Sequence, residues 1–136
     1  MKLALNDYRR IALGCAYIAE EEGKIRFHRF TEAEELFYKK RDELLGKSFS
    51  KRCFAPAGVR LCFATDSKRL KLSVTTGKAT SRSYFSFEVF ENGRLLGYLD
   101  NFKEEELLEN YTEQEFSLGR YGKSFALTDK NSEITV

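Results

Sequence analysis

Three observations predict a mainly β protein, an antiparallel β-sandwich of jelly-roll type with one short helix. Short segments alternate apolar and polar residues, and turn residues separate these segments at hairpin spacing. The composition is also rich in aromatic residues, with 12 Phe and 7 Tyr but no Trp. A chain of 136 residues with 42% hydrophobic residues can bury the core of one domain. We therefore expect residues 1–136 to form a single β-sandwich domain.

The N-terminal part predicts a hairpin. Asn6 and Asp7 are typical caps for a short helical turn through Arg10. Residues 11–19 are apolar on both sides, which indicates a buried strand, and residues 24–30 alternate. The acidic residues before Gly23 turn the chain between these two strands.

The helix begins at Thr31. Thr31 and Glu34 have the spacing of a capping box, and Gly46 is a natural stop. A run of charged residues predicts a solvated outer side for this helix; it comprises Glu32, Glu34, Glu35, Lys39, Lys40, Arg41, Asp42 and Glu43. Residues 48–54 follow as a connection with some strand character.

Residues 58–99 organise the rest of the chain as two hairpin-like units. Residues 59–64 and 70–75 each alternate, and the segment Thr65-Asp66-Ser67 separates them. In the second unit, Asn92-Gly93 separates two β-rich segments, and this pair favours a type I′ turn.

The C-terminal part predicts further short strands. They comprise residues 115–118, 124–127 and 133–136, and residues 102–110 are expected to form a loop with one helical turn. The last strand stops as it begins, so we expect the chain to be part of a longer protein.

The charges and cysteines exclude several classes of function. The net charge of +2 is the balance of 23 basic and 21 acidic residues, which gives no basic face for nucleic acid. No stretch approaches the ~20 apolar residues of a membrane span. Cys15, Cys53 and Cys62 are odd in number and lack C-x-x-C spacing, so we expect free thiols and a cytoplasmic location.

No catalytic or metal site is expected. His28 is the only histidine and lies in an alternating strand, where a packed or surface role is the usual one. The thiols lie in apolar strands without an activating group, and the sequence has no nucleophile motif and no phosphate-binding loop. Glu104, Glu105 and Glu106 are typical of a solvated acidic loop rather than a calcium site. No cofactor is expected.

Aromatic residues of the central and C-terminal strands suggest a binding site. Tyr84, Tyr98 and Tyr121 each have a basic or polar neighbour and are the candidate ligand-binding residues. Aromatic rings with polar neighbours can stack sugars, but core packing is the alternative for each of them. A carbohydrate-binding or protein-interaction module is therefore one hypothesis.

A second hypothesis comes from a family resemblance. The segment AGVRLCFATDSKRLKLSV at residues 57–74 resembles the N-terminal sandwich domain that precedes SGNH-type (GDSL-like) esterases. Glu88-Val89-Phe90 before Asn92-Gly93 is similar to a later motif of that domain, with Glu for the usual Asp and Phe for the usual Tyr. RFTEAEELFY at residues 29–38 is similar to the helix at the start of the domain in bacterial members.

The resemblance implies an accessory role. The catalytic Ser, Asp and His of such hydrolases belong to the α/β domain that follows, so no catalytic residue is carried over to this chain. The implied protein is an esterase or lipase-like acylhydrolase, and its catalytic domain is the expected partner of this chain. An isolated accessory domain exposes the apolar patch that its partner would cover, so we expect a tendency to form homodimers.

Overall fold

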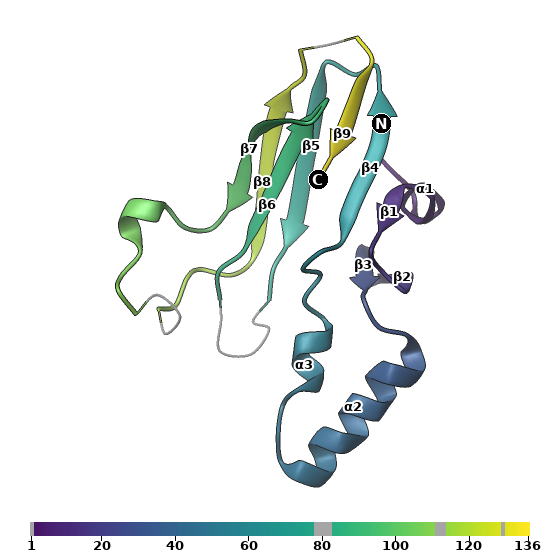
Figure 1. Ribbon diagram of the computed structural model, residues 1–136, viewed down its shortest axis with the longest axis vertical. Coiled ribbons are helices and arrows are strands. Elements are labelled where there is room, and N and C mark those ends of the chain that lie inside the picture. The colour runs from purple at the N-terminus through teal and green to yellow at the C-terminus, as the bar shows by residue number, and fades with distance from the viewer. Residues whose placement is uncertain (1, 78–82, 111–113, 129) are drawn as a thin grey trace. The chain divides into compact units, whose positions relative to one another are not determined.

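The computed structural model describes residues 2–77, 83–110, 114–128 and 130–136 (Figure 1). Of these residues, 39% lie in strands and 22% in helices, so the protein is mainly β, and all its strand pairs are antiparallel. The internal contacts divide the chain into two compact units, Met1–Leu61 and Cys62–Val136. None of the described helices combines the length and apolar character needed to span a membrane.

The first unit contains three helices and a hairpin. Its elements are α1 (Leu5–Ile11), β1 (Ala12–Leu13), β2 (Tyr17–Glu21), β3 (Lys24–His28), α2 (Glu32–Leu45), α3 (Ser50–Cys53) and the start of β4 (Arg60–Thr65), which pairs with β1. The expected hairpin is confirmed, and its turn residues Glu22 and Gly23 have φ of 52° and 72°. The single strand predicted over residues 11–19 is wrong as one element, because Ile11 ends α1 and the chain forms two strands, β1 and β2, with Gly14 at a φ of 80° between them.

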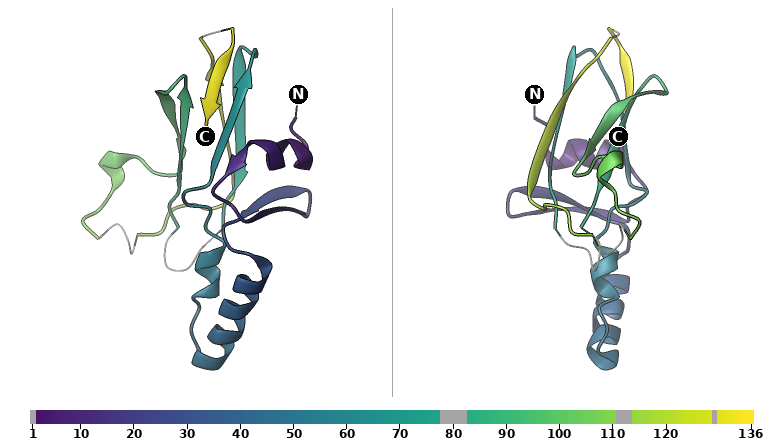
Figure 2. Two further views of the ribbon diagram at one scale, coloured as in Figure 1. Left: turned by 45° about the vertical axis from the view of Figure 1, so that its right-hand side comes forward. Right: turned by 90° about the vertical axis from the view of Figure 1, so that its left-hand side faces the viewer.

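The capping residues of α2 are as predicted, but the segment after it is helical. The Thr31 side chain accepts a hydrogen bond from Glu34 N–H, and Gly46 ends α2 with a φ of 60°. The strand character expected at residues 48–54 is wrong. Ser50 N–H donates instead to the Asp42 carboxylate, so the chain forms the short helix α3 alongside α2 (Figure 2).

In α2, two acidic side chains are largely buried and several large apolar side chains are exposed, which is the reverse of the usual pattern. Asp42 is the buried residue of this helix, and the Glu35 side chain is only 14% exposed. Four large apolar side chains of α2 are instead exposed: Leu36, Phe37, Leu44 and Leu45. The expected solvated charged side is confirmed for Glu32, Glu34, Lys39, Lys40, Arg41 and Glu43, which are exposed. It is wrong for Glu35 and Asp42, because hydrogen bonds hold these two carboxylates against the rest of the first unit.

In the described residues of the second unit, the regular elements are strands and one 3-10 turn. Its elements are the rest of β4, β5 (Arg69–Thr75), β6 (Ser86–Glu91), β7 (Arg94–Asp100), η1 (Glu104–Glu106), β8 (Arg120–Ala126) and β9 (Ser132–Thr135). In the second unit the strands run in the order β4-β9-β6-β7, and β5 pairs with β8. Asn92 and Gly93 have φ of 50° and 75°, so the predicted turn between β6 and β7 is confirmed.

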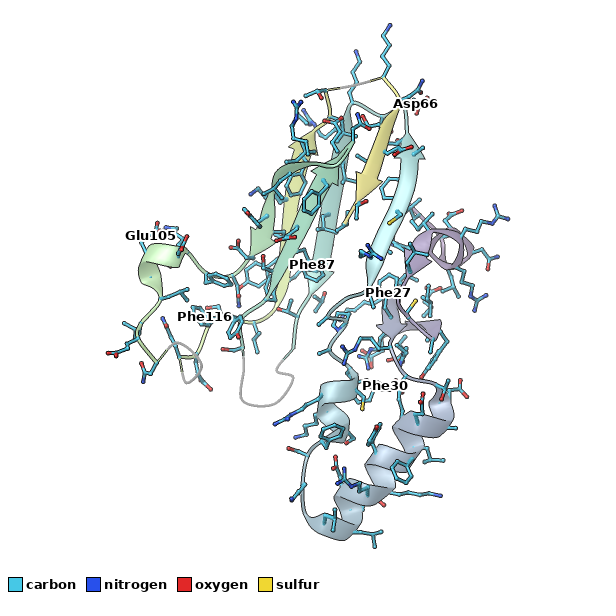
Figure 3. The ribbon with its side chains drawn as sticks, viewed as in Figure 1. Phe27, Phe30, Asp66, Phe87, Glu105 and Phe116 are labelled. Carbon is cyan, nitrogen blue, oxygen red and sulfur yellow. The ribbon has the colours of Figure 1, made fainter. Side chains whose placement is uncertain are left out.

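The expected hairpin around Thr65-Asp66-Ser67 is wrong. β4 pairs with β9 and β5 pairs with β8, so this turn carries the chain from one sheet to the other. Thr65 Oγ1 accepts a hydrogen bond from Ser67 N–H, and Asp66 lies in the turn, just past the end of β4 (Figure 3).

Four strands of the second unit each contribute a buried apolar residue to its core. Val89, Leu99, Phe125 and Ile134 are at most 6% exposed, and the Phe125 ring lies 3.6 Å from the Cβ position of Gly97, which brings β8 against β7. The strand predicted over residues 115–118 is absent from the described residues there, because Phe116 N–H bonds to the Ser83 hydroxyl instead of a neighbouring strand.

Candidate functional site

His28 lies at the centre of a buried polar cluster in the first unit. Its side chain is stacked on Tyr17, with ring centroids 4.0 Å apart and planes inclined by 12°. The imidazole Nδ1 lies 2.8 Å from Glu35 Oε1, and Nε2 lies 3.5 Å from Glu21 Oε1. Only 3% of His28 is exposed, so both ring nitrogens face carboxylates rather than open solvent.

Two local features of the sequence assemble this cluster. The Glu22-Gly23 turn fixes the hairpin register so that Tyr17 is directly opposite His28, on the same face of the strand pair. The Thr31 cap starts α2 just after β3, which places Glu35 in its first turn beside the ring. Tyr17 and Glu35 were not expected as partners of His28. The Glu22-Gly23 turn was the signal in the sequence that could have predicted the pairing of Tyr17 with His28.

Tyr17 is held in its protonated form. Its hydroxyl donates to Glu35 Oε2 over 3.0 Å, and burial followed by this hydrogen bond raises the pKa of Tyr17 to about 12. Glu35 therefore accepts from Tyr17 and contacts His28 with its other oxygen.

The cluster lacks an activated nucleophile. Cys53 is 1% exposed, and burial and the Glu35 charge raise the pKa of its thiol, whereas catalytic thiols need a lowered one. Within the described ranges, no group of three His, Cys, Asp or Glu side chains could hold a metal ion. The arrangement fits a structural role, in which His28 ties the hairpin to α2.

A cleft of about 420 Å³ lies beside this cluster, and its lining includes Glu21, Glu32 and Glu35. One of these carboxylates is already paired with a cation of the same chain. Arg26 pairs with Glu21 at 3.1 Å and lies 5.6 Å from the centre of the Phe54 ring. We therefore do not assign a ligand to this cleft.

The three predicted tyrosines lie on different elements. Tyr84 precedes β6, and its ring makes edge contacts with Phe102 and Phe116. Tyr121, on β8, packs its ring on Phe85 and donates its hydroxyl to a backbone carbonyl. Tyr98 is 44% exposed on β7, and the next residue along that strand is buried, so its side chain is on the outer side. Tyr98 is thus on the outward side of β7, whereas Tyr121 is on the inward side of β8, opposite Val74. The two rings therefore do not form a shared binding platform.

The outer face of β5 and β8 contains a shallow hollow in the second unit. The hollow has a volume of about 360 Å³ and is lined by Lys71, Ser73, Arg120, Tyr121, Gly122, Lys123 and Ser124. Strand register explains its composition, because Lys71 is opposite Ser124 and Ser73 is opposite Gly122. Outward positions of β5 are polar, while its inward positions are Leu70, Leu72 and Val74.

The charge of this hollow is positive. Two cations, Lys71 and Arg120, lie at outward positions of its lining, and the lining contains no carboxylate. Lys123 is opposite the inward residue Leu72, and its ammonium group donates to the Tyr98 carbonyl over 2.6 Å. Lys71 and Arg120 are exposed, and in the described part of the chain neither forms an ion pair. The alternation along β5 predicts its inward apolar residues, and the same alternation could have predicted the basic outward positions Arg69 and Lys71.

No family model, curated protein or solved structure matches this chain.

Proposed function

We propose that this chain is the non-catalytic N-terminal accessory domain of an SGNH-type esterase or acylhydrolase. In this proposal it is a β-sandwich of jelly-roll type that packs on the catalytic domain and helps to shape the substrate cleft. The segment with the family resemblance supports the proposal, because residues 57–74 contain β4, β5 and the turn that joins two sheets. Such a crossing between sheets is what a sandwich needs.

The observation that carries the proposal is the exposed apolar surface of α2. Leu36, Phe37, Leu44 and Leu45 are 52%, 61%, 85% and 53% exposed. A surface helix normally turns its apolar residues inward, so an outward apolar face marks an interaction site. The partner that this face fits is the catalytic domain that the resemblance implies. In the absence of that domain, the same face would pair two copies of the chain, which light scattering at high concentration would detect as dimers.

The environment of the reactive side chains supports a non-catalytic role. His28 is enclosed between two carboxylates and Tyr17, and Cys53 is a buried thiol with a raised pKa. The three cysteines are free, which supports a reducing, cytoplasmic location.

The test compares the protein encoded by the uninterrupted reading frame with this chain. We expect the reading frame to continue into an α/β domain with a Gly-Asp-Ser nucleophile, and only the longer protein to hydrolyse an aryl acetate. Substituting Leu44→Gln in the longer protein should weaken the docking, while Lys39→Gln on the same helix serves as the control. A reading frame that ends after Val136 would contradict the proposal.

A free-standing carbohydrate-binding module is the second candidate. The exposed ring of Tyr98 favours it, because an outward aromatic ring can stack on a sugar. Titration calorimetry against a glycan panel tests it, and a Tyr98→Ala variant should then lose the binding. Flat titrations across the panel would count against this candidate.

A further inference from the structure

We propose that the outer face of β5 and β8 binds a uronate-containing oligosaccharide in the hollow between Lys71 and Arg120. This goes beyond the accessory role, because it assigns a ligand to the second unit itself. It rests on the charge, the spacing and the floor of the hollow, and it does not require the esterase assignment.

The charge of the hollow requires an anionic ligand. Lys71 and Arg120 are exposed cations that form no ion pair within the described residues, and the lining holds no carboxylate. A guanidinium group such as that of Arg120 binds a carboxylate through two parallel hydrogen bonds.

The spacing favours a ligand with several charges. Arg120 is opposite Thr75, which is four positions along β5 from Lys71. At the usual rise of a strand, these positions are about 13 Å apart. An oligomer with a carboxylate on successive sugars spans this distance, so that each cation can pair with a carboxylate of its own.

The floor of the hollow is kept open by Gly122. A Cβ atom at this position would lie 3.3 Å from Ser73 Oγ, in the space above that hydroxyl. The φ of Gly122 is not in the left-handed region, so the backbone does not require glycine there. The missing side chain leaves the Ser73 hydroxyl accessible, and Ser124 adds a second hydroxyl to the lining. Hydroxyls of this kind pair with sugar hydroxyls.

The same face is poorly suited to nucleic acid. Single-stranded nucleic acid needs aromatic rings on which bases stack. Tyr121 is the aromatic residue of the lining, but its ring packs on Phe85 and its hydroxyl donates to the Ser117 carbonyl. The small net charge of +2 also differs from the strongly basic surfaces of nucleic-acid-binding proteins.

The test is a calorimetric titration of the chain with an oligogalacturonate. Its fully methyl-esterified form of equal length is the neutral control ligand. We expect the acidic form to bind, with an affinity that falls as salt is added, and the ester to bind far more weakly. The double variant Lys71→Gln/Arg120→Gln should bind about tenfold more weakly. The variant Arg94→Gln/Lys130→Gln removes the same charge from exposed positions outside the lining and should keep the wild-type affinity.

A second variant separates binding from folding. Gly122→Val fills the hollow without changing the charge, and valine is favoured in strands, so the melting temperature should not fall while binding is lost. Equal binding of the acidic and esterified ligands would overturn the proposal. So would equal losses in the two double variants, or tighter binding of polyglutamate or of single-stranded DNA. These results do not depend on the reading-frame comparison, so the two proposals fail separately.

Discussion

At the scale of single residues, Glu35 is the side chain on which the buried cluster depends. One of its oxygens accepts from Tyr17 and the other contacts His28, and only 14% of its side chain is exposed. A buried carboxylate with two partners is costly to remove because the partners lose their hydrogen bonds without regaining water. This explains how a hairpin and a helix are held together by polar side chains.

Replacing Glu35 should therefore destabilise the first unit. We expect Glu35→Ala to lower the free energy of unfolding by about 1–3 kcal/mol, because Tyr17 and His28 lose a buried partner. Glu32→Ala, on the exposed side of the same helix, should change it by less than about 0.5 kcal/mol. Urea denaturation followed by far-UV circular dichroism measures both, and equal losses would contradict the account of the cluster.

Tyr17 gives a prediction about pH. The pKa of Tyr17 is raised from 10.0 to about 12 by burial and by Glu35, so the folded state favours the protonated phenol. Its contribution to stability is complete below pH 10 and is lost as the pH rises from 10 to about 12.

A comparison with Tyr17→Phe isolates this effect, since phenylalanine does not titrate. Between pH 10 and about 12, the free energy of unfolding of the wild type should fall relative to that of Tyr17→Phe. Denaturation curves recorded across that range measure it. A difference that stays constant would show that Tyr17 titrates normally.

At the scale of elements, local signals were predicted well and strand partners were not. The Thr31 cap, the Gly46 stop and the Asn92-Gly93 turn depend on neighbouring residues only, and the structure confirms them. Alternation tells which side of a strand is buried, but it does not tell which strand lies next to it. For this reason β4 was assigned to a hairpin with β5, whereas its partner β9 is the last strand of the chain.

The candidate site shows the same limit. His28 is packed, which is one of the two roles expected for it, but Glu35 contacts its ring and is not on the solvated side that was expected. The error arose because a run of charges was read as one exposed face. Asp42 was misplaced for the same reason, since its carboxylate accepts from the Ser50 backbone only after the chain has turned into α3.

The cap of α2 can be tested directly. Thr31 accepts from Glu34 N–H, and loss of this bond in Thr31→Ala should cost about 1 kcal/mol of stability. Thr31→Ser keeps the hydroxyl and should retain most of the stability. Thermal melting of the two variants against wild type measures the difference, and an unchanged melting temperature for Thr31→Ala would argue against the cap.

At the scale of the whole molecule, each of the two units presents one candidate binding surface. The first unit presents the apolar face of α2, and the second presents a cationic hollow on β5 and β8. The reactive side chains are enclosed in structural roles, as His28 and Cys53 illustrate. The proposal of an accessory domain requires such surfaces and does not require a nucleophile in this chain.

The most direct test of this account is the hydrolysis of an aryl acetate by the chain alone, measured beside the His28→Asn variant. We expect both proteins to give only the rate of the buffer, because His28 lies between two carboxylates and the Cys53 thiol is buried with a raised pKa. Hydrolysis by the wild type that is lost in His28→Asn would contradict the account and identify the His28 cluster as a catalytic site.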